Sequence, residues 1–295
     1  MKTFIKHLMT FTFMITALSM SQSTYANDST PIIKVDTVGS GQPVILIPGL
    51  MSDGSVWQST AKALSKNYQV HIVNVAGFGA TPETEGTTAR NIEQAIVDYI
   101  HQEKLHSPVV IGHSFGGFIA LALTVNPQVA IKKTISVDGL PFIGPVFTRT
   151  NATTPEDLRP QALQIRNLYR QLNREQLLAQ TQLGIAIQAT SKEAQQNVLD
   201  LAAQSDPATV GQITHDLMVR DLRPLLAGDN TPILLLGASG AFTNQAEHAY
   251  AKSLYEEQLA QAPHARVIMN TESRHFIMFD DPTWLNNHIT AFLGE

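Results

Sequence analysis

Seven short runs rich in apolar residues recur along the chain, most of them closed by glycine or proline. The run at 44–47, for example, is wholly apolar and is followed by Pro48-Gly49. Such runs are typical of strands that are buried on both faces of a parallel sheet. The predicted strands are 32–37 (expected at an edge), 44–47, 69–75, 108–112, 133–137, 232–236 and 266–269.

Helical patterns lie between these runs. Ile92, Ile96, Tyr99 and Ile100 share one face of a predicted helix, and further helices are predicted over 118–125, 247–259 and 282–293. For the last of these, Asp281 can cap the helix and Pro282 suits its first turn. Alternating short strands and helices predict an α/β fold with a mostly parallel, doubly wound sheet.

One interval, 140–230, contains no convincing strand. Its apolar residues show helical spacing, and eleven glutamines between Gln161 and Gln212 give polar, uncharged faces. We expect a helical cap lying over the sheet, with a plain extra helical layer as the alternative. The domain prediction is therefore a core of residues 27–139 and 231–295 with a cap of residues 140–230.

Residues 1–26 have the features of a cleaved signal peptide. Lys2 and Lys6 precede a 13-residue run that is mostly apolar and contains threonine and serine, and Ala26 is a small residue at the expected cleavage point. The run is shorter than the roughly 20 residues of a membrane-spanning helix. We expect export, to the periplasm or medium if the host is bacterial, and no stable membrane insertion after cleavage. An uncleaved anchor is the alternative.

Composition excludes several functions. Cysteine is absent, which removes thiol nucleophiles, disulfides and thiolate metal sites. The formal net charge is −5 and becomes −7 without the leader. Bulk charge therefore disfavours a nucleic-acid partner. The sequence does not indicate an oligomeric state.

The sharpest chemical motif is Gly112-His113-Ser114-Phe115-Gly116-Gly117, which follows a predicted strand and precedes a predicted helix. It matches G-x-S-x-G in the context that this motif requires. A serine at the tip of such a tight turn projects its hydroxyl outward. The residues two before and two after approach too closely for side chains, so both must be glycine. A glycine-rich turn without chemistry is the alternative.

With this motif the chain resembles the α/β-hydrolase superfamily, in particular serine hydrolases of the esterase and lipase type with a helical cap. Residues 47–50 resemble the loop that forms the oxyanion hole, 77–79 resemble the loop after the next strand, and 273–276 resemble the catalytic-histidine loop. The 140–230 insert occupies the usual cap position. The resemblance extends over essentially the whole chain after the leader.

A serine needs a base, and His275 is the candidate among ten histidines because it follows the last predicted strand at its carboxyl end. A histidine on a surface loop is the alternative. In many relatives the acid follows the strand at 232–236, which has no carboxylate here. Asp138 ends the strand at 133–137, where some relatives carry the acid. A Ser-His dyad, Asp53 or Glu272 remain alternatives.

The resemblance implies an acyl-enzyme mechanism with the N–H groups of Leu50 and Phe115 in the oxyanion hole and no metal or organic cofactor. Met51, Phe142 and Phe147 are the candidate substrate-binding residues, although the phenylalanines could instead anchor the cap. We expect a hydrolase of carboxylic esters of apolar, uncharged acyl substrates. A lactonase, thioesterase or amidase would use the same residues, and a non-catalytic ligand-binding protein is the competing class.

Overall fold

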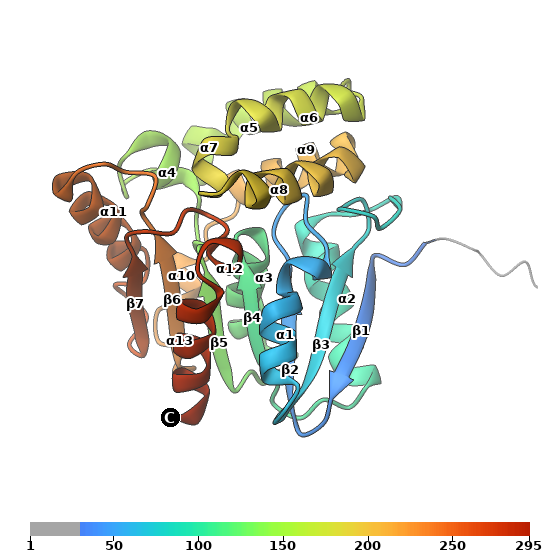
Figure 1. The fold of residues 1–295 in the computed structure, drawn as a ribbon, viewed down its shortest axis with the longest axis vertical. Coiled ribbons are helices and arrows are strands. Elements are labelled where there is room, and N and C mark those ends of the chain that lie inside the picture. The colour runs from blue at the N-terminus through green and yellow to red at the C-terminus, as the bar shows by residue number, and fades with distance from the viewer. Residues whose placement is uncertain (1–29) are drawn as a thin grey trace, which may run out of the picture.

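The computed structural model describes residues 30–295, so the predicted signal peptide lies outside the described residues. Its centre is a seven-stranded sheet in the order β1-β3-β2-β4-β5-β6-β7, in which only β1 is antiparallel to its neighbour (Figure 1). The predicted mostly parallel α/β sheet is thereby confirmed, with its first strand at an edge. The strands are β1 (Ile33–Gly39), β2 (Gln42–Ile47), β3 (Tyr68–Val75), β4 (Val109–His113), β5 (Lys133–Val137), β6 (Ile233–Ala238) and β7 (Ala265–Asn270).

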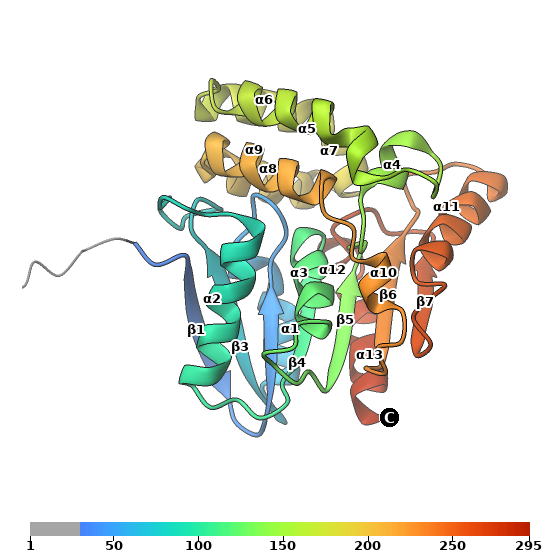
Figure 2. The same ribbon diagram turned by 180° about the vertical axis from the view of Figure 1, so that it is seen from behind.

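Helices cover both faces of the sheet, which explains why its strands are apolar at successive positions. Ile45 and Ile47 of β2 pack into a cluster with α2 (Ala89–Gln102) and α3 (Phe115–Thr124). Val44 and Leu46 of the same strand pack on the opposite face with α1 (Gln58–Leu64) and α13 (Pro282–Gly294). Figures 1 and 2 show these two helical layers from opposite sides.

The strand order reverses direction at β2. The chain passes from β2 to β3 on one side, and then returns to place β4 on the other side of β2. The loops that leave the carboxyl ends of β2 and β4 therefore diverge and open a crevice. Ligands in open α/β sheets bind at such a switch point.

Only helices form between β5 and β6 in the described structure. They lie above the carboxyl edge of the sheet, except for the short last helix Arg223–Leu226, which lies lower, beside β6 (Figures 1 and 2). We call this layer the cap. The exact boundaries 140 and 230 stay a prediction. The cap consists of α4 (Gly144–Thr148), α5 (Pro155–Tyr169), α6 (Arg174–Leu183), α7 (Ile185–Gln188), α8 (Lys192–Gln204), α9 (Pro207–Met218) and α10 (Arg223–Leu226).

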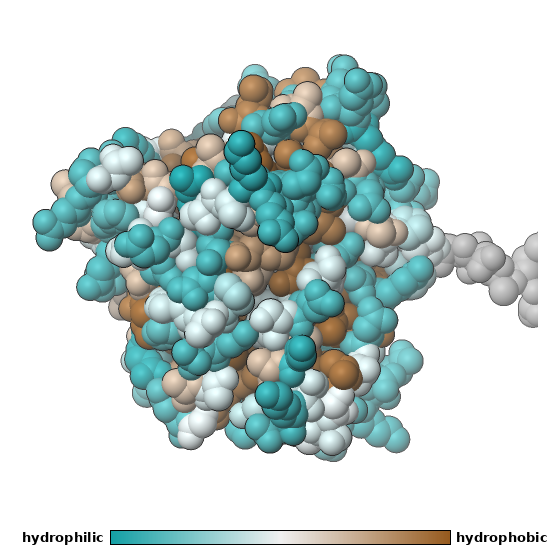
Figure 3. Space-filling model, in the orientation of Figure 1, coloured by the Kyte–Doolittle hydropathy of each residue, from teal (hydrophilic) through white to brown (hydrophobic). Residues whose placement is uncertain are grey.

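The remaining helices complete the core: a 3-10 turn at Gly54–Trp57, α11 (Gln245–Gln258) and α12 (Ile277–Asp280). As predicted, the Asp281 side chain caps α13 by accepting a hydrogen bond from the Trp284 N–H. Figure 3 shows a mainly hydrophilic face with apolar side chains exposed on the cap at its top. Within residues 30–295, none of the helices combines the length and the hydropathy that crossing a bilayer requires.

Candidate active site

Ser114 occupies a strained turn between β4 and α3. Its φ of 53° and ψ of −117° are unfavourable for a residue with a side chain, at a cost of about 1–3 kcal/mol. A Cβ on Gly112 would lie 1.9 Å from the Gly116 carbonyl oxygen, and a Cβ on Gly116 would lie 2.2 Å from the Ile47 carbonyl oxygen. Both glycines of the motif are therefore required by close backbone contacts.

The backbone fixes this turn to the neighbouring strand, because the Ser114 N–H donates a 2.9 Å hydrogen bond to the Val137 carbonyl. Ser114 and His275 line the same cavity. The Ser114 hydroxyl makes no hydrogen bond to another group in residues 30–295. Hydrogen bonds between nucleophile and base are often long without substrate and tighten in the reacting complex.

Asp138 and His275 are brought together from the ends of β5 and β7. His275 Nδ1 lies 2.6 Å from Asp138 Oδ2, and the Asp138 side chain is only 7% exposed. The other carboxylate oxygen of Asp138 accepts 2.8 Å hydrogen bonds from the Ala238 N–H and the Tyr255 hydroxyl. Because Nδ1 faces the carboxylate, Nε2 is the imidazole nitrogen left for proton transfer.

Sequence reasoning missed Tyr255, which lies on α11 and donates to Asp138. Burial, followed by the negative charge of Asp138 and this hydrogen bond, raises the pKa of the Tyr255 phenol well above its usual 10.0. The hydroxyl therefore stays protonated and remains a donor. Tyr255 lies on a half-buried helix, and nothing in the sequence around it indicates that its hydroxyl faces a carboxylate.

The alternative carboxylates do not contact His275. Asp53 accepts a 3.0 Å hydrogen bond from the Ser55 N–H and so caps the 3-10 turn at Gly54–Trp57. Glu272 is exposed and makes no side-chain hydrogen bond to the histidine in the described structure. Asp138 is therefore the carboxylate paired with His275.

His113 supports the base from within the core. It is fully buried, and its Nε2 is 3.0 Å from the His275 carbonyl oxygen, to which it donates. Burial, and secondarily the proximity of His275, lowers the pKa of His113 well below 6.5. His113 is thus a neutral donor that holds the backbone of the His275 loop.

Two backbone N–H groups at the switch point are free to bind an anion. Leu50 follows β2 and Phe115 is the first residue of α3, and neither N–H donates a hydrogen bond to an acceptor within residues 30–295. The positive end of α3 adds favourable potential beside Ser114. The loop before Leu50 packs closely on the turn, since a Cβ on Gly49 would lie 3.2 Å from the Ser114 Cβ. Unpaired N–H groups beside a nucleophile are what an oxyanion hole requires, so the predicted role of Leu50 and Phe115 remains a prediction that their lack of partners permits.

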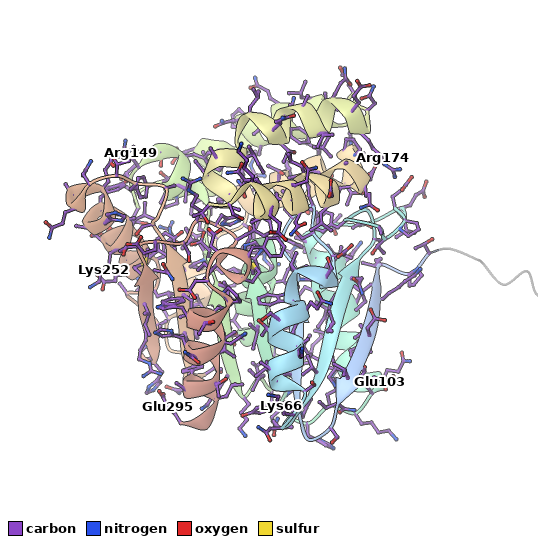
Figure 4. The ribbon with its side chains drawn as sticks, in the orientation of Figure 1. Lys66, Glu103, Arg149, Arg174, Lys252 and Glu295 are labelled. Carbon is purple, nitrogen blue, oxygen red and sulfur yellow. The ribbon has the colours of Figure 1, made fainter. Side chains whose placement is uncertain are left out.

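The cavity at Ser114 has a volume of about 570 Å³ and extends between the sheet edge, the cap and α11. Most of its wall is apolar. Its charged members away from the Asp138–His275 pair are Arg149 and Glu247, and Figure 4 shows Arg149 on the cap, close to α11. Its apolar wall includes Phe118, Leu140, Ile143, Val146, Ile187, Leu217, Phe242 and Leu254. Among the described residues, no group of three metal-binding side chains could hold a metal ion.

None of the predicted substrate-binding residues Met51, Phe142 and Phe147 lines this cavity, so their role in binding stays a prediction. Phe142 is fully buried in a separate cluster of the cap, beneath the Arg223 guanidinium at 4.9 Å. Phe147 is 49% exposed, and its neighbour Val146 lines the cavity instead. The Met51 sulfur accepts a weak 3.8 Å contact from Thr181 of α6, so it contacts the cap.

Curated relatives match only part of the chain. A pimeloyl-[acyl-carrier protein] methyl ester esterase of Vibrio cholerae is 30% identical over 103 residues, which are 35% of this chain and 39% of that protein. The esterase of the same name from Aeromonas salmonicida is 29% identical over 112 residues, 37% of this chain and 42% of that protein. The chain thus matches about 40% of the length of these relatives.

Solved structures match the fold over almost the whole described chain. An enol-lactonase of Burkholderia xenovorans LB400 has a TM-score of 0.71 at 19% identity, covering 89% of this chain and 96% of that chain. A thermophilic esterase of Thermogutta terrifontis has a TM-score of 0.72 at 18% identity, covering 88% and 92%. The family model described as the alpha/beta hydrolase family matches residues 44–288. The chain therefore belongs to the alpha/beta hydrolase family.

Proposed function

We propose that this protein is a serine hydrolase that cleaves carboxylic esters of apolar, uncharged acyl substrates through Ser114, His275 and Asp138. The observation that carries the proposal is the shared cavity of a serine on a strained turn and a histidine whose Nδ1 lies 2.6 Å from a buried carboxylate. A serine with this partner pair suits nucleophilic attack on an acyl carbon. The partial match to ester-cleaving relatives favours the ester class.

In the proposed mechanism, His275 Nε2 takes the proton of the Ser114 hydroxyl as its oxygen attacks the ester carbonyl. The N–H groups of Leu50 and Phe115 stabilise the negative charge on the carbonyl oxygen. His275 then donates the proton to the leaving alcohol, and the acyl group remains on Ser114. Water, activated by the same imidazole, releases the acid and restores the serine. Asp138 orients the imidazole and stabilises its positive charge throughout.

The substrate class follows from the cavity. Its wall is mostly apolar, and its volume of about 570 Å³ falls within the usual range for small-molecule sites. An uncharged acyl chain loses little solvation on entering such a cavity, whereas an ionised group would need a partner. We therefore expect kcat/KM to rise with acyl length until the cavity is filled.

The test is hydrolysis of p-nitrophenyl esters of increasing acyl length by the wild type and by Ser114→Ala. The variant should lose at least about 10³-fold in turnover, while the surface control Ser59→Ala should match the wild type. A fluorophosphonate should label the wild type and not Ser114→Ala. A wild type that binds these esters but neither cleaves them nor takes the label would establish the non-catalytic alternative. Matched panels of lactones, thioesters and amides would separate the related hydrolase activities.

We also propose that residues 1–26 direct export and are removed. The support is the sequence of this segment: two early lysines, a short apolar run, and Ala26. Amino-terminal sequencing of protein recovered from a bacterial host should begin at Asn27, with activity outside the cytoplasm. An intact mass that retains the segment would contradict cleavage.

A further inference from the structure

A four-residue segment of the cap is bonded to the loop that carries His275. The segment, residues 187–190, comprises the last two residues of α7 and the two residues after it, and it leads toward α8. Its backbone accepts from the histidine loop: the Phe276 N–H donates to the Gln188 carbonyl at 2.8 Å, and the His275 N–H donates to the Ile187 carbonyl at 3.4 Å. The cap therefore contacts the candidate base through its own main chain.

Asp280 fastens the two segments together. Its Oδ1 accepts from the Thr190 N–H at 2.8 Å and from the Thr190 hydroxyl at 2.7 Å. Its Oδ2 accepts from the N–H of Arg274, the residue before His275, at 2.8 Å. One carboxylate thus joins the cap to the chain immediately before the base. The Arg274 side chain adds a 3.0 Å hydrogen bond to the Ala189 carbonyl.

The other supports of His275 come from the core. Asp138 holds its ring at Nδ1, and His113 holds its carbonyl oxygen. The cap supplies the remaining support, and Ile187 and Gln188 of the same segment also line the cavity with His275. A displacement of the cap segment would therefore change the cavity wall and the position of the histidine backbone together.

We propose that Asp280 is a positioning residue that couples the docking of the cap to the placement of His275 beside Ser114. The inference rests on the proposed function, because it concerns the proton transfer at that site. Asp280 touches neither Ser114 nor the cavity, so its effect is exerted through Thr190 and Arg274. A misplacement of about 1 Å in a reacting group can cost roughly 10²-fold in rate.

Neighbouring residues offer matched variants. Asp281 has the same side chain one position later, but it accepts from the Trp284 N–H within α13 and makes no hydrogen bond to the cap. Asn is an equally good helix cap, so Asp281→Asn keeps this local role. Thr190→Val removes only the hydroxyl that donates to Asp280, whereas Thr190→Ser keeps it.

The kinetic test measures kcat and KM on one ester, with kcat normalised to the sites that a fluorophosphonate titrates. Asp280→Ala should lower kcat at least about tenfold while KM changes less than threefold. Thr190→Val should lower kcat severalfold, with activity retained in Thr190→Ser and Asp281→Asn. In the Asp280→Ala background, Thr190→Val should add no further loss, because the shared interaction is already absent.

Hydrogen exchange gives a readout that does not depend on activity. In Asp280→Ala, peptides covering 185–191 and 273–281 should exchange faster together, while the β4 and β5 peptides keep their protection. A per-site kcat within twofold of wild type, or additive losses in the double variant, would overturn the coupling and leave the proposed function intact. If wild type and Ser114→Ala are equally inactive, the proposed function itself fails.

Discussion

His275 Nδ1 lies 2.6 Å from Asp138 Oδ2, although 137 residues separate the two positions. The parallel sheet produces this contact, because β5 and β7 both end at the same edge and β6 lies between them. The carboxylate is held in place before any substrate binds, since the Ala238 N–H and the Tyr255 hydroxyl occupy its other oxygen. Such preorganisation is what the proposed catalytic role of this pair needs.

Asp138→Asn should lower kcat by about 10³–10⁴ without unfolding the protein. The amide preserves the shape of the side chain, and its oxygen takes the place that accepts from the Ala238 N–H and the Tyr255 hydroxyl. Its NH2 group then faces Nδ1 as a donor, which favours the imidazole tautomer with its proton on Nε2, and that tautomer cannot take the Ser114 proton. The measurement is turnover of a p-nitrophenyl ester. Asp229→Asn is the control, because Asp229 accepts from Thr231 before β6, at the opposite edge of the sheet. Near-normal turnover in Asp138→Asn would reassign the orienting role.

Gly112→Ala should destabilise the protein by about 3 kcal/mol or more, because the new Cβ would overlap the Gly116 carbonyl oxygen at 1.9 Å. The readout is the free energy of unfolding in urea. Gly184→Ala is the matched control, since its Cβ would meet nothing closer than 3.9 Å. Equal stability of the two variants would show that the turn at Ser114 can relax.

Tyr255→Phe should lower both stability and turnover. It removes one of three hydrogen bonds to the Asp138 carboxylate, a change of about 1–3 kcal/mol for a buried charged acceptor. We expect kcat to fall severalfold, measured beside the unfolding free energy. Tyr68→Phe, at the amino end of β3, should leave kcat unchanged. A wild-type kcat in Tyr255→Phe would mean that the Ala238 N–H alone suffices to hold the carboxylate.

Phe142→Ala should cost about 3–5 kcal/mol in the free energy of unfolding, since the ring is fully buried with Leu158 and Met218. Phe147→Ala, with half of the side chain exposed, should cost less than about 1 kcal/mol. Thermal and urea unfolding of both variants test this difference. If Phe142→Ala were neutral and changed substrate preference instead, Phe142 would belong to the binding site after all.

Local patterns were sufficient to predict the sheet. Short apolar runs closed by glycine or proline, such as 44–47, are typical of strands buried on both faces, and the structure shows this burial. The turn motif locates Ser114 at a strand end. The pairing of Asp138 with His275 follows from the same reasoning about strand ends, so a single sequence could suggest it.

The rest depends on how helices rotate and dock. Whether Val146 or Phe147 of α4 faces the cavity is set by the rotation of a five-residue helix, for which the sequence has no strong periodicity. Tyr255 donates one hydrogen bond to Asp138, and Asp280 accepts hydrogen bonds from Thr190 of the cap and from the Arg274 N–H. Those contacts depend on side-chain orientation across packed elements, and a single sequence does not encode them in any local pattern.

His113 should make stability fall as pH is lowered below about 6.5. Burial lowers its folded-state pKa well below 6.5, so in this range the unfolded chain binds a proton that the folded protein does not. The free energy of unfolding rises with pH wherever the unfolded state binds more protons than the folded state. For one group such as His113, this rise is up to about 1.4 kcal/mol per pH unit. The stability that the neutral His113 contributes is fully present above pH 6.5, and it is lost progressively as the pH falls toward the folded-state pKa of His113.

The measurement is the free energy of unfolding in urea between pH 5 and pH 8, for wild type and His113→Gln. Glutamine keeps an N–H donor for the His275 carbonyl but does not titrate, so the variant should show a shallower loss of stability below pH 6.5. His106→Gln, at an exposed position, should keep the wild-type slope. Parallel curves for wild type and His113→Gln would mean that His113 becomes protonated in the folded protein, and that the hydrogen bond to His275 does not require a neutral ring.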